Sequence, residues 1–207
     1  MTSPRGGSPI ASSEPSGRLV LASESPRRLA LLAQAGIRPD RVRAAAIDES
    51  PAPGEPPRSH ALRLAAEKAH TVSAKLREEG FVLAADTVVA CGRRILPKAE
   101  DPAMVRRCLQ LLSGRQHCVM TAIALLPPDG RLRTRLVETR VAFRRLTAAE
   151  IAAYADSREG EGKAGGYAIQ GRAEVFVRRI NGSYSNVVGL PLAETVLLLR
   201  GCGYGNW

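Results

Sequence analysis

The segment from Leu19 to Ala33 constrains the fold of this chain more than any other. It begins with the apolar run Leu19–Ala22, passes through a polar loop, and ends in the helix-like stretch Leu29–Ala33. The pattern predicts a strand, a loop and then a helix over Pro26–Ala35 that ends at a glycine. In that order, the first N–H groups of the helix and the positive end of its dipole point toward the loop.

The loop itself carries the side chains of an anion site. It contains the hydroxyl groups of Ser23 and Ser25 and the neighbouring guanidinium groups of Arg27 and Arg28. Guanidinium groups bind phosphate oxygens through paired hydrogen bonds. The alternative is a serine N-cap with Pro26 in the first helical turn and both arginines in solvent. The loop alone leaves both interpretations open.

Strands and helices alternate along the rest of the chain. Strands are predicted at Phe81–Ala85 with its continuation Val88–Ala90, Val119–Leu126, Leu132–Arg145 and Val175–Ile180, and helices at Arg58–Leu76, from Asp101 onward, at Ala148–Ala155 with Thr147 and Glu150 as a capping box, and at Pro191–Leu199. A turn at Pro127–Gly130 joins two of the strands into a hairpin, so the strands do not all run parallel. We therefore expect an α/β fold with a mixed, twisted sheet flanked by helices.

The ends of the chain differ in composition from the middle. Residues 1–17 are rich in Ser, Pro and Gly and lack the apolar stretch of a signal peptide, so we expect a disordered N-terminal tail. Residues 18–201 are predicted to form one domain, and residues 202–207 a C-terminal tail. The chain has no apolar run of the roughly 20 residues needed to span a membrane.

The four cysteines and the net charge narrow the possible functions further. No two cysteines form a CxxC pair, which argues against a zinc site and for free thiols in a reducing compartment, so we expect a cytoplasmic protein. The net charge of +10 raises nucleic acid as a partner. The basic residues are spread along the chain, however, and aromatic residues make up only 4%, too few for a base-stacking surface. The composition thus argues against a nucleic-acid partner.

Two acidic positions are candidates for chemistry. Asp86 and Thr87 follow an apolar strand, and ligands in open α/β sheets bind beyond the carboxyl ends of strands. A carboxylate there binds Mg²⁺ or accepts a proton from water. The alternative, slightly favoured by this segment alone, is a local polar turn. Asp48 and Glu49 form a second acidic site on a loop, with a solvated pair as the alternative.

Lysines and an amide complete the candidates. Lys68 lies beside the apolar stripe of a predicted helix, Lys98 follows a predicted turn, and Lys163 lies in the glycine-rich stretch 160–166. With the two arginines they would suit a triphosphate, which requires several cations and usually a divalent ion. Each lysine alone could equally lie in solvent, and the glycine-rich stretch could be a flexible connector. The Gln170 amide could read a base edge or pair across strands. His117 is expected to be a structural, hydrogen-bonded histidine.

Together, these segments resemble the Maf family of nucleoside triphosphate pyrophosphatases, from about Leu19 to Leu199. The resemblance lies in Leu21–Arg28, Asp48–Ser50, Glu67–Ala69, Ala85–Val89, Leu111–Arg115, Lys163–Gly171 and Asn181–Pro191. It implies a two-lobed α/β fold with a central cleft, related to inosine triphosphate pyrophosphatases, and a homodimer. It also implies hydrolysis of a nucleoside triphosphate to the monophosphate and pyrophosphate, which limits non-standard nucleotides in the pool.

The resemblance also implies roles for single residues. Asp86 matches the proton acceptor, Arg27, Thr87 and Gln170 match positions linked to substrate choice, and Glu49, Lys68 and Lys98 match the remaining polar cleft positions. We expect Glu49 and Asp86 to hold Mg²⁺ or Mn²⁺. The Ile-Gln-Gly and Ala-Asp-Thr motifs resemble the branch that acts on dTTP and UTP, not the branch that acts on 7-methyl-GTP.

One motif departs from the family pattern. The family usually has Gly-Lys-Pro where this chain has Pro97-Lys98-Ala99, which puts the placement of Lys98 in question. Other functions compatible with the sequence are hydrolysis of purine or modified-base triphosphates and a non-catalytic role. The non-catalytic role would be regulation of cell division or septum formation, or nucleic-acid binding, which the positive charge would assist.

Overall fold

The computed structural model describes residues 17–76 and 79–205. The predicted N-terminal tail therefore lies outside the described residues, apart from Gly17. The predicted C-terminal tail is described as far as Gly205. Within it, Tyr204 is buried and its ring lies edge-on against Phe81, with 5.3 Å between the ring centroids.

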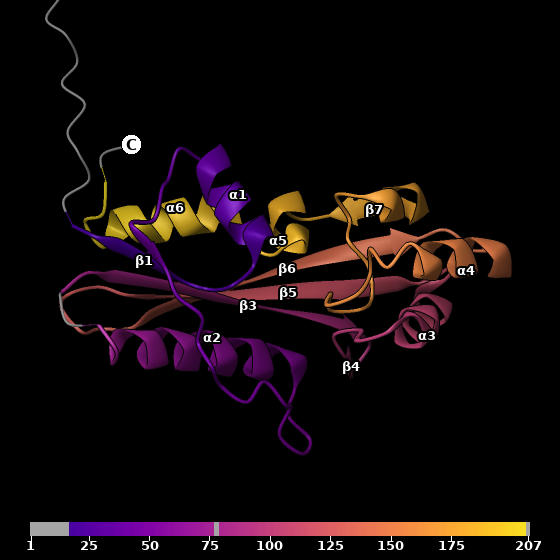
Figure 1. Cartoon of the computed structure of the whole chain (residues 1–207), viewed down its shortest axis with the longest axis horizontal. Helices are drawn as coiled ribbons and strands as arrows, with labels where there is room; N and C mark the ends of the chain where they lie inside the picture. The colour runs from indigo at the N-terminus through magenta and orange to yellow at the C-terminus, as the bar shows by residue number, and fades with distance from the viewer. Residues whose placement is uncertain (1–16, 77–78, 206–207) are drawn as a thin grey trace, which may run out of the picture.

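One seven-stranded sheet forms the centre of the structure (Figure 1). The strands are β1 (Leu19–Ala22), β2 (Arg41–Val42), β3 (Phe81–Cys91), β4 (Arg94–Leu96), β5 (Gln116–Leu126), β6 (Arg133–Phe143) and β7 (Val177–Asn181). The main order is β2-β1-β3-β5-β6-β7, and β4 pairs with β3. Strand β1 runs parallel to β2 and β3, whereas the other pairs are antiparallel. The prediction of a mixed sheet in an α/β fold is confirmed.

Helices cover both faces of this sheet. They are α1 (Pro26–Gln34), α2 (Pro57–Ser73), α3 (Pro102–Leu112), α4 (Ala148–Asp156), α5 (Tyr184–Val188) and α6 (Leu192–Gly201), with a short 3-10 helix at Arg172–Phe176. Figure 1 shows α2 on one face, α1, α5 and α6 on the other, and α3 and α4 at the far end of the sheet. Among the described residues, no helix is both long enough and apolar enough to cross a membrane.

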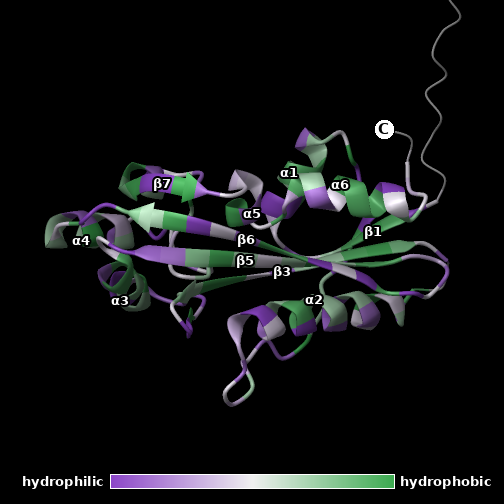
Figure 2. Cartoon of the chain, turned by 180° about the vertical axis from the view of Figure 1, so that it is seen from behind, coloured by the Kyte–Doolittle hydropathy of each residue, from purple (hydrophilic) through white to green (hydrophobic). Residues whose placement is uncertain are grey.

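Small side chains bring α2 close to the sheet. Ala61, Ala65 and Ala69 recur along one side of the helix and are completely buried in the same core cluster as Val82 and Ala84 of β3. The ribbon of α2 in Figure 2 accordingly alternates between hydrophobic and hydrophilic colours, as expected of a helix with one apolar face. This packing fixes the orientation of α2 over the middle of β3.

The edge of β3 that lies opposite β5 is divided between two partners. β1 pairs with Phe81–Ala84, and β4 pairs with Val89–Cys91. Between them, residues 85–88 have no strand partner on that edge within the described part of the chain. The sheet therefore forks at the middle of β3, and the two lobes with a cleft between them follow from this fork.

Several local predictions differ from the structure. Asp86 and Thr87 do not form a turn, because β3 continues through them without interruption. The segment predicted as a strand from Val175 begins as the 3-10 helix, and β7 starts only at Val177. β2, β4 and α5 were not predicted, since elements of two to five residues are too short to show a hydrophobic period.

Candidate active site

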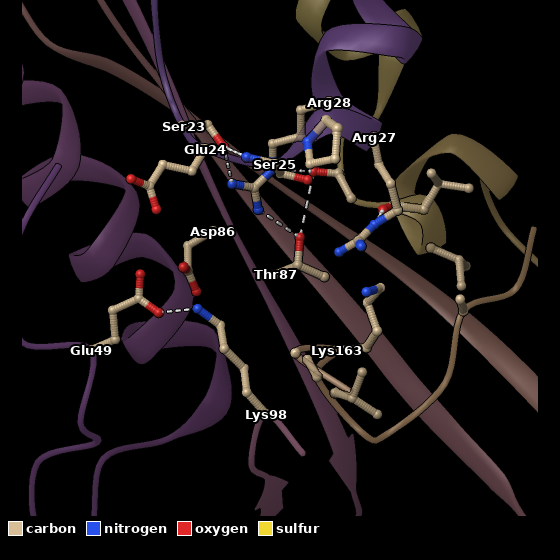
Figure 3. Close-up of a pocket in the computed structure, with 18 of the residues that line it drawn as sticks. Ser23, Glu24, Ser25, Arg27, Arg28, Glu49, Asp86, Thr87, Lys98 and Lys163 are labelled. Carbon is tan, nitrogen blue, oxygen red and sulfur yellow. Dashed lines mark hydrogen bonds and ion pairs between the residues drawn. The ribbon is translucent and has the colours of Figure 1, made fainter. Parts of the chain in front are cut away.

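A cavity of about 360 Å³ lies where the sheet forks. Its walls come from both lobes: the loop between β1 and α1, the middle of β3, the start of the loop that leads to α2, and the segments 162–170 and 187–189. The cavity is lined by Ser23, Ser25, Arg27, Arg28, Glu49, Lys68, Asp86, Thr87, Lys98, Lys163 and Gln170. Figure 3 labels all of these except Lys68 and Gln170. All the predicted site residues are thus gathered in one place.

Asp48 is the exception among the acidic candidates. It does not line the cavity, and its carboxylate instead accepts a hydrogen bond from the backbone N–H of Ser50, at 2.9 Å. Only Glu49 of the predicted acidic pair faces the site. Adjacent loop residues point in different directions, so a carboxylate pair in sequence is not a pair in space.

Carboxylates and ammonium groups alternate along one wall of the cavity. Lys68 Nζ donates to Asp86 Oδ1 at 2.6 Å and lies 2.6 Å from Glu49 Oε1. Lys98 Nζ contacts the second oxygen of Glu49. Lys68 is 6% exposed, since it extends from α2 just beside the buried alanine stripe. The solvated-lysine interpretation is therefore wrong for Lys68, and Glu49 joins the two lysines.

Glu49 is held in its ionised form. Its partial burial by itself would raise its pKa, but hydrogen bonds from Lys68 and Lys98 outweigh that effect and lower the pKa to about 2. Lys98 reaches this position despite the unusual Pro97-Lys98-Ala99 sequence. Its backbone forms an isolated bridge with Ala164, and the N–H of Ala99 donates to the carbonyl of Lys163.

Arg28 serves the fold as well as the cavity. It donates from Nε to the Gly189 carbonyl at 2.8 Å, from one terminal nitrogen to Ser23 Oγ at 3.1 Å, and from the other to Thr87 Oγ1 at 3.2 Å. Burial lowers the pKa of Arg28, and the nearby charge of Asp86 opposes that effect. The Arg28 side chain is therefore not surrounded by solvent, and its guanidinium is not free of protein partners as a phosphate-binding group would be.

The rest of the loop from β1 to α1 combines both interpretations of the sequence. Pro26 begins α1 as expected, but the Ser25 hydroxyl makes no capping bond. Ser23 Oγ instead accepts from the N–H of Ser25 at 3.2 Å. Within the described part of the chain, Arg27 makes one long hydrogen bond, from Nε to the Val188 carbonyl at 3.4 Å. Its guanidinium points into the cavity in Figure 3.

Buried aromatic side chains position the loop that carries Lys163 and Gln170. Tyr154 Oη accepts from the N–H of Ala168 at 3.0 Å, and His117 Nε2 lies 2.8 Å from Tyr167 Oη. Burial lowers the pKa of His117 to about 4, so this histidine is neutral and structural, as predicted. Gln170 lies in a turn and is exposed at the cavity, which rules out the cross-strand role. Sequence reasoning missed Tyr154 and Tyr167, which look like ordinary core residues.

The glycine-rich stretch is a rigid wall and not a flexible connector. Gly165 has a φ of 70°, and a Cβ atom at this position would lie 2.8 Å from the Val89 side chain. Only glycine combines this backbone conformation with so close an approach to β3. The stretch therefore packs directly on the strand that carries Asp86.

The carboxylates suit a divalent metal only together with a ligand. No group of three or more His, Cys, Asp or Glu side chains in residues 17–76 and 79–205 could hold a metal ion. Asp86 and Glu49 nevertheless line the same cavity and both contact Lys68. Mg²⁺ in proteins is commonly held by one or two carboxylates plus substrate phosphates. The donor set fits Mg²⁺ or Mn²⁺ bound in that way.

The chain is similar to known proteins over most of its length. The chain is 62% identical over 186 residues to the dTTP/UTP pyrophosphatase of Caulobacter vibrioides, covering 90% of this chain and 96% of the relative. It is 61% identical over 186 residues to the dTTP/UTP pyrophosphatase of Paramagnetospirillum magneticum, covering 90% and 97%.

A solved structure and a family model also match. The dITP/XTP pyrophosphatase of Mycobacterium abscessus is similar over 89% of this chain and 94% of that one, with 20% identity and a TM-score of 0.44. The family model described as Maf-like protein matches residues 18–202, almost the whole of the described structure. The chain therefore belongs to the Maf family.

Proposed function

We propose that this protein hydrolyses nucleoside triphosphates, with dTTP and UTP as its substrates, to the nucleoside monophosphate and pyrophosphate. The observation that carries the proposal is the grouping of Asp86 with Lys68, Lys98, Arg27 and Lys163 around one cavity. The relatives at about 60% identity that are named dTTP/UTP pyrophosphatases support the choice of substrate. The cavity volume of about 360 Å³ falls within the range usual for small-molecule sites.

The cations would hold the triphosphate. Arg27, Lys98 and Lys163 line the cavity with their charged ends, and Lys68 lies deeper, beside Asp86. Phosphoryl transfer depends on positioning and on fixed charges that stabilise the transition state. In this proposal Lys98 and Lys68 exchange part of their contact with Glu49 for phosphate oxygens, so the carboxylate keeps both ammonium groups oriented until the substrate arrives.

Asp86 would act as the proton acceptor. It is 4% exposed, lies in the stretch of β3 where one edge has no strand partner among the described residues, and is oriented by the hydrogen bond from Lys68. A water molecule attacks the α-phosphorus, the bond from that atom to the bridging oxygen breaks, pyrophosphate leaves, and the water proton passes to Asp86. When bound by Asp86 and Glu49, Mg²⁺ or Mn²⁺ would neutralise phosphate charge and lower the pKa of bound water.

Gln170 and Thr87 would contact the base. Both line the cavity. The Gln170 amide offers both a donor and an acceptor, which a pyrimidine edge can match. A site that hydrogen-bonds its substrate rejects bases that leave these groups unpaired.

The cellular setting is part of the same proposal. All four cysteines are free thiols, which suits a reducing compartment such as the cytoplasm. The family resemblance supports a homodimer, and removal of non-standard nucleotides from the pool is the role that this chemistry would serve.

The test is a panel of triphosphates incubated with the protein in Mg²⁺ or in EDTA. The panel contains dTTP, UTP, dCTP, dATP, dGTP and 7-methyl-GTP. Released pyrophosphate and released orthophosphate are measured separately. We expect metal-dependent release of pyrophosphate, fastest from dTTP and UTP. No release from any nucleotide by folded protein would overturn the proposal and favour a binding or regulatory role. Faster release from a purine nucleotide would overturn the choice of substrate.

A further inference from the structure

Thr87 is held by hydrogen bonds on two sides. Arg28 donates to Thr87 Oγ1 at 3.2 Å, and Thr87 Oγ1 lies 3.0 Å from Thr121 Oγ1 on the neighbouring strand β5 (Figure 3 shows the first contact). Thr121 is completely buried and does not line the cavity. It therefore does not contact a bound ligand itself, and it reaches the cavity through Thr87 and through the Asn186 carbonyl, which adjoins the lining residues 187–189.

The direction of these hydrogen bonds is determined by their outer ends. Thr121 Oγ1 lies 3.0 Å from the carbonyl oxygen of Asn186, which only accepts. Asn186 is in the last turn of α5, where carbonyl groups have no donor within the helix, and the residue is completely buried. Because an unpaired buried carbonyl is costly, the single proton of Thr121 is used there.

The proton of Thr87 is then committed as well. Thr121 has no second proton, so Thr87 must be the donor in the contact between the two hydroxyls. The other acceptor near Thr87, the Gly189 carbonyl, is 3.5 Å away, compared with 3.0 Å for Thr121 Oγ1, so the contact with Thr121 is the stronger one. Thr87 Oγ1 thus accepts from Arg28, donates to Thr121, and has one lone pair left for the cavity.

We propose that Thr121 is a positioning residue for substrate choice, because it makes the Thr87 hydroxyl an acceptor toward the bound base. Thymine and uracil carry an N3–H donor between two carbonyl groups, whereas N3 of cytosine is a lone pair. A hydroxyl that can only accept forms a hydrogen bond with the N3–H of thymine or uracil. Against cytosine, its lone pair would face the lone pair of N3. This inference rests on the proposed function, and it explains how that site would separate dTTP and UTP from cytosine nucleotides.

The test compares dTTP with 5-methyl-dCTP, which has the same shape and differs only in its donors and acceptors. Thr121→Val preserves the volume of the side chain and removes its hydroxyl, so the Thr87 proton becomes free to turn toward the ligand. We expect the ratio of kcat/KM for dTTP to that for 5-methyl-dCTP to fall about tenfold, the effect of relieving one unpaired polar contact. Thr121→Ser restores the hydroxyl and is expected to keep the wild-type ratio.

A matched control separates this role from simple stability. Thr195 is also completely buried and donates from Oγ1 to a backbone carbonyl, that of Pro191, at 2.7 Å. Thr195→Val is expected to lower the melting temperature without changing the nucleotide ratio. If Thr121→Val does not fold, Thr121→Ala takes its place. The ratio of kcat/KM for dTTP to that for 5-methyl-dCTP in the wild type is a second readout, because the proposal requires the wild-type protein to prefer dTTP.

The outcomes distinguish the two proposals. An unchanged ratio in a folded Thr121→Val or Thr121→Ala protein, or equal use of both nucleotides by the wild type, would overturn the role of Thr121 while leaving the pyrophosphatase proposal intact. Absence of hydrolysis by the wild type would overturn both. A tenfold loss of selectivity in Thr121→Val, together with wild-type selectivity in Thr121→Ser, would support both proposals.

Discussion

Asp86 and Thr87 are consecutive residues of β3, yet their side chains bond to opposite sides of the sheet and line the same cavity. Asp86 bonds to Lys68 of α2, and Thr87 bonds to Arg28 of α1. Side chains alternate between the faces of a strand, so in a continuous sheet these two residues would be separated. The fork at residues 85–88 opens the sheet at that point, and the proposed water-activating group and base-contacting group can then act on one ligand.

The first prediction concerns Asp86. An amide at this position cannot accept the water proton, so Asp86→Asn should lower kcat by about 10²–10⁴-fold. Lys68 keeps its contact with Glu49, so the fold should persist. Steady-state pyrophosphate release and circular dichroism check the two statements. The control is Glu67→Gln, which removes a half-buried carboxylate that lies one residue from Lys68 and pairs with Arg63. Wild-type turnover by Asp86→Asn would exclude Asp86 as the proton acceptor.

The second prediction contrasts the two lysines that contact Glu49. Lys68→Met leaves Asp86 buried without its cation, so the free energy of unfolding should fall by about 3 kcal/mol. The Lys98 side chain is 55% exposed, so Lys98→Met should change stability by about 0–1 kcal/mol. Both variants should lose activity, because both remove a charge from the proposed phosphate site. Urea unfolding alongside turnover measures the contrast, and equal loss of stability in both variants would contradict the assignment of Lys68 as the buried member.

The third prediction concerns Gln170. Removing its amide should reduce the preference for dTTP over dATP and dGTP about tenfold while total turnover changes less, because the side chain is proposed to contact the base and not the phosphates. Ratios of kcat/KM for Gln170→Ala give the answer. Gln110, exposed on α3, supplies the matched control Gln110→Ala. An unchanged ratio in Gln170→Ala would remove the proposed contact between Gln170 and the base.

The fourth prediction is a pH dependence of stability. Burial lowers the pKa of His117 from its ordinary 6.5 to about 4, so the folded protein binds this proton less readily than the unfolded chain. Its contribution to stability is therefore present above about pH 6.5 and lost as the pH falls toward 4, with a total of about 3 kcal/mol.

A non-titrating variant isolates this contribution. His117→Gln can still hydrogen-bond to Tyr167, and its stability should fall less than that of the wild type between pH 7 and pH 4.5. His70 is exposed near the end of α2, so His70→Gln should follow the wild type. Urea unfolding at the two pH values checks this, and parallel curves for His117→Gln and the wild type would contradict the burial of an uncharged His117.

Local patterns predicted the parts of the structure that depend on neighbouring residues. The order of apolar run, loop and helix at Leu19–Ala33 is present as β1 and α1, and Thr147 and Glu150 form the predicted capping box. Asp86 was placed at the end of a strand, whereas it lies in the middle of β3. A polar pair in an apolar run looks like a turn, but the strand continues because β3 stays paired with β5 through Asp86 and Thr87.

Long-range contacts account for what the sequence could not predict. The role of Arg28 depends on the Gly189 carbonyl, which is 161 residues away in the sequence. In the sequence, Thr121 looks like any other strand residue. Its role depends on contacts with Asn186 and Thr87, which only the folded chain brings together. The contact between Lys98 and Glu49 likewise joins two loops whose separation no local pattern encodes.

The most direct test of the account is hydrolysis of dTTP in water labelled with oxygen-18, followed by mass spectrometry of both products. Attack of water on the α-phosphorus predicts one labelled oxygen in thymidine monophosphate and none in pyrophosphate. Label in pyrophosphate, or release of labelled orthophosphate, would show attack on a different phosphorus atom and would contradict the placement of Asp86 beside the α-phosphate.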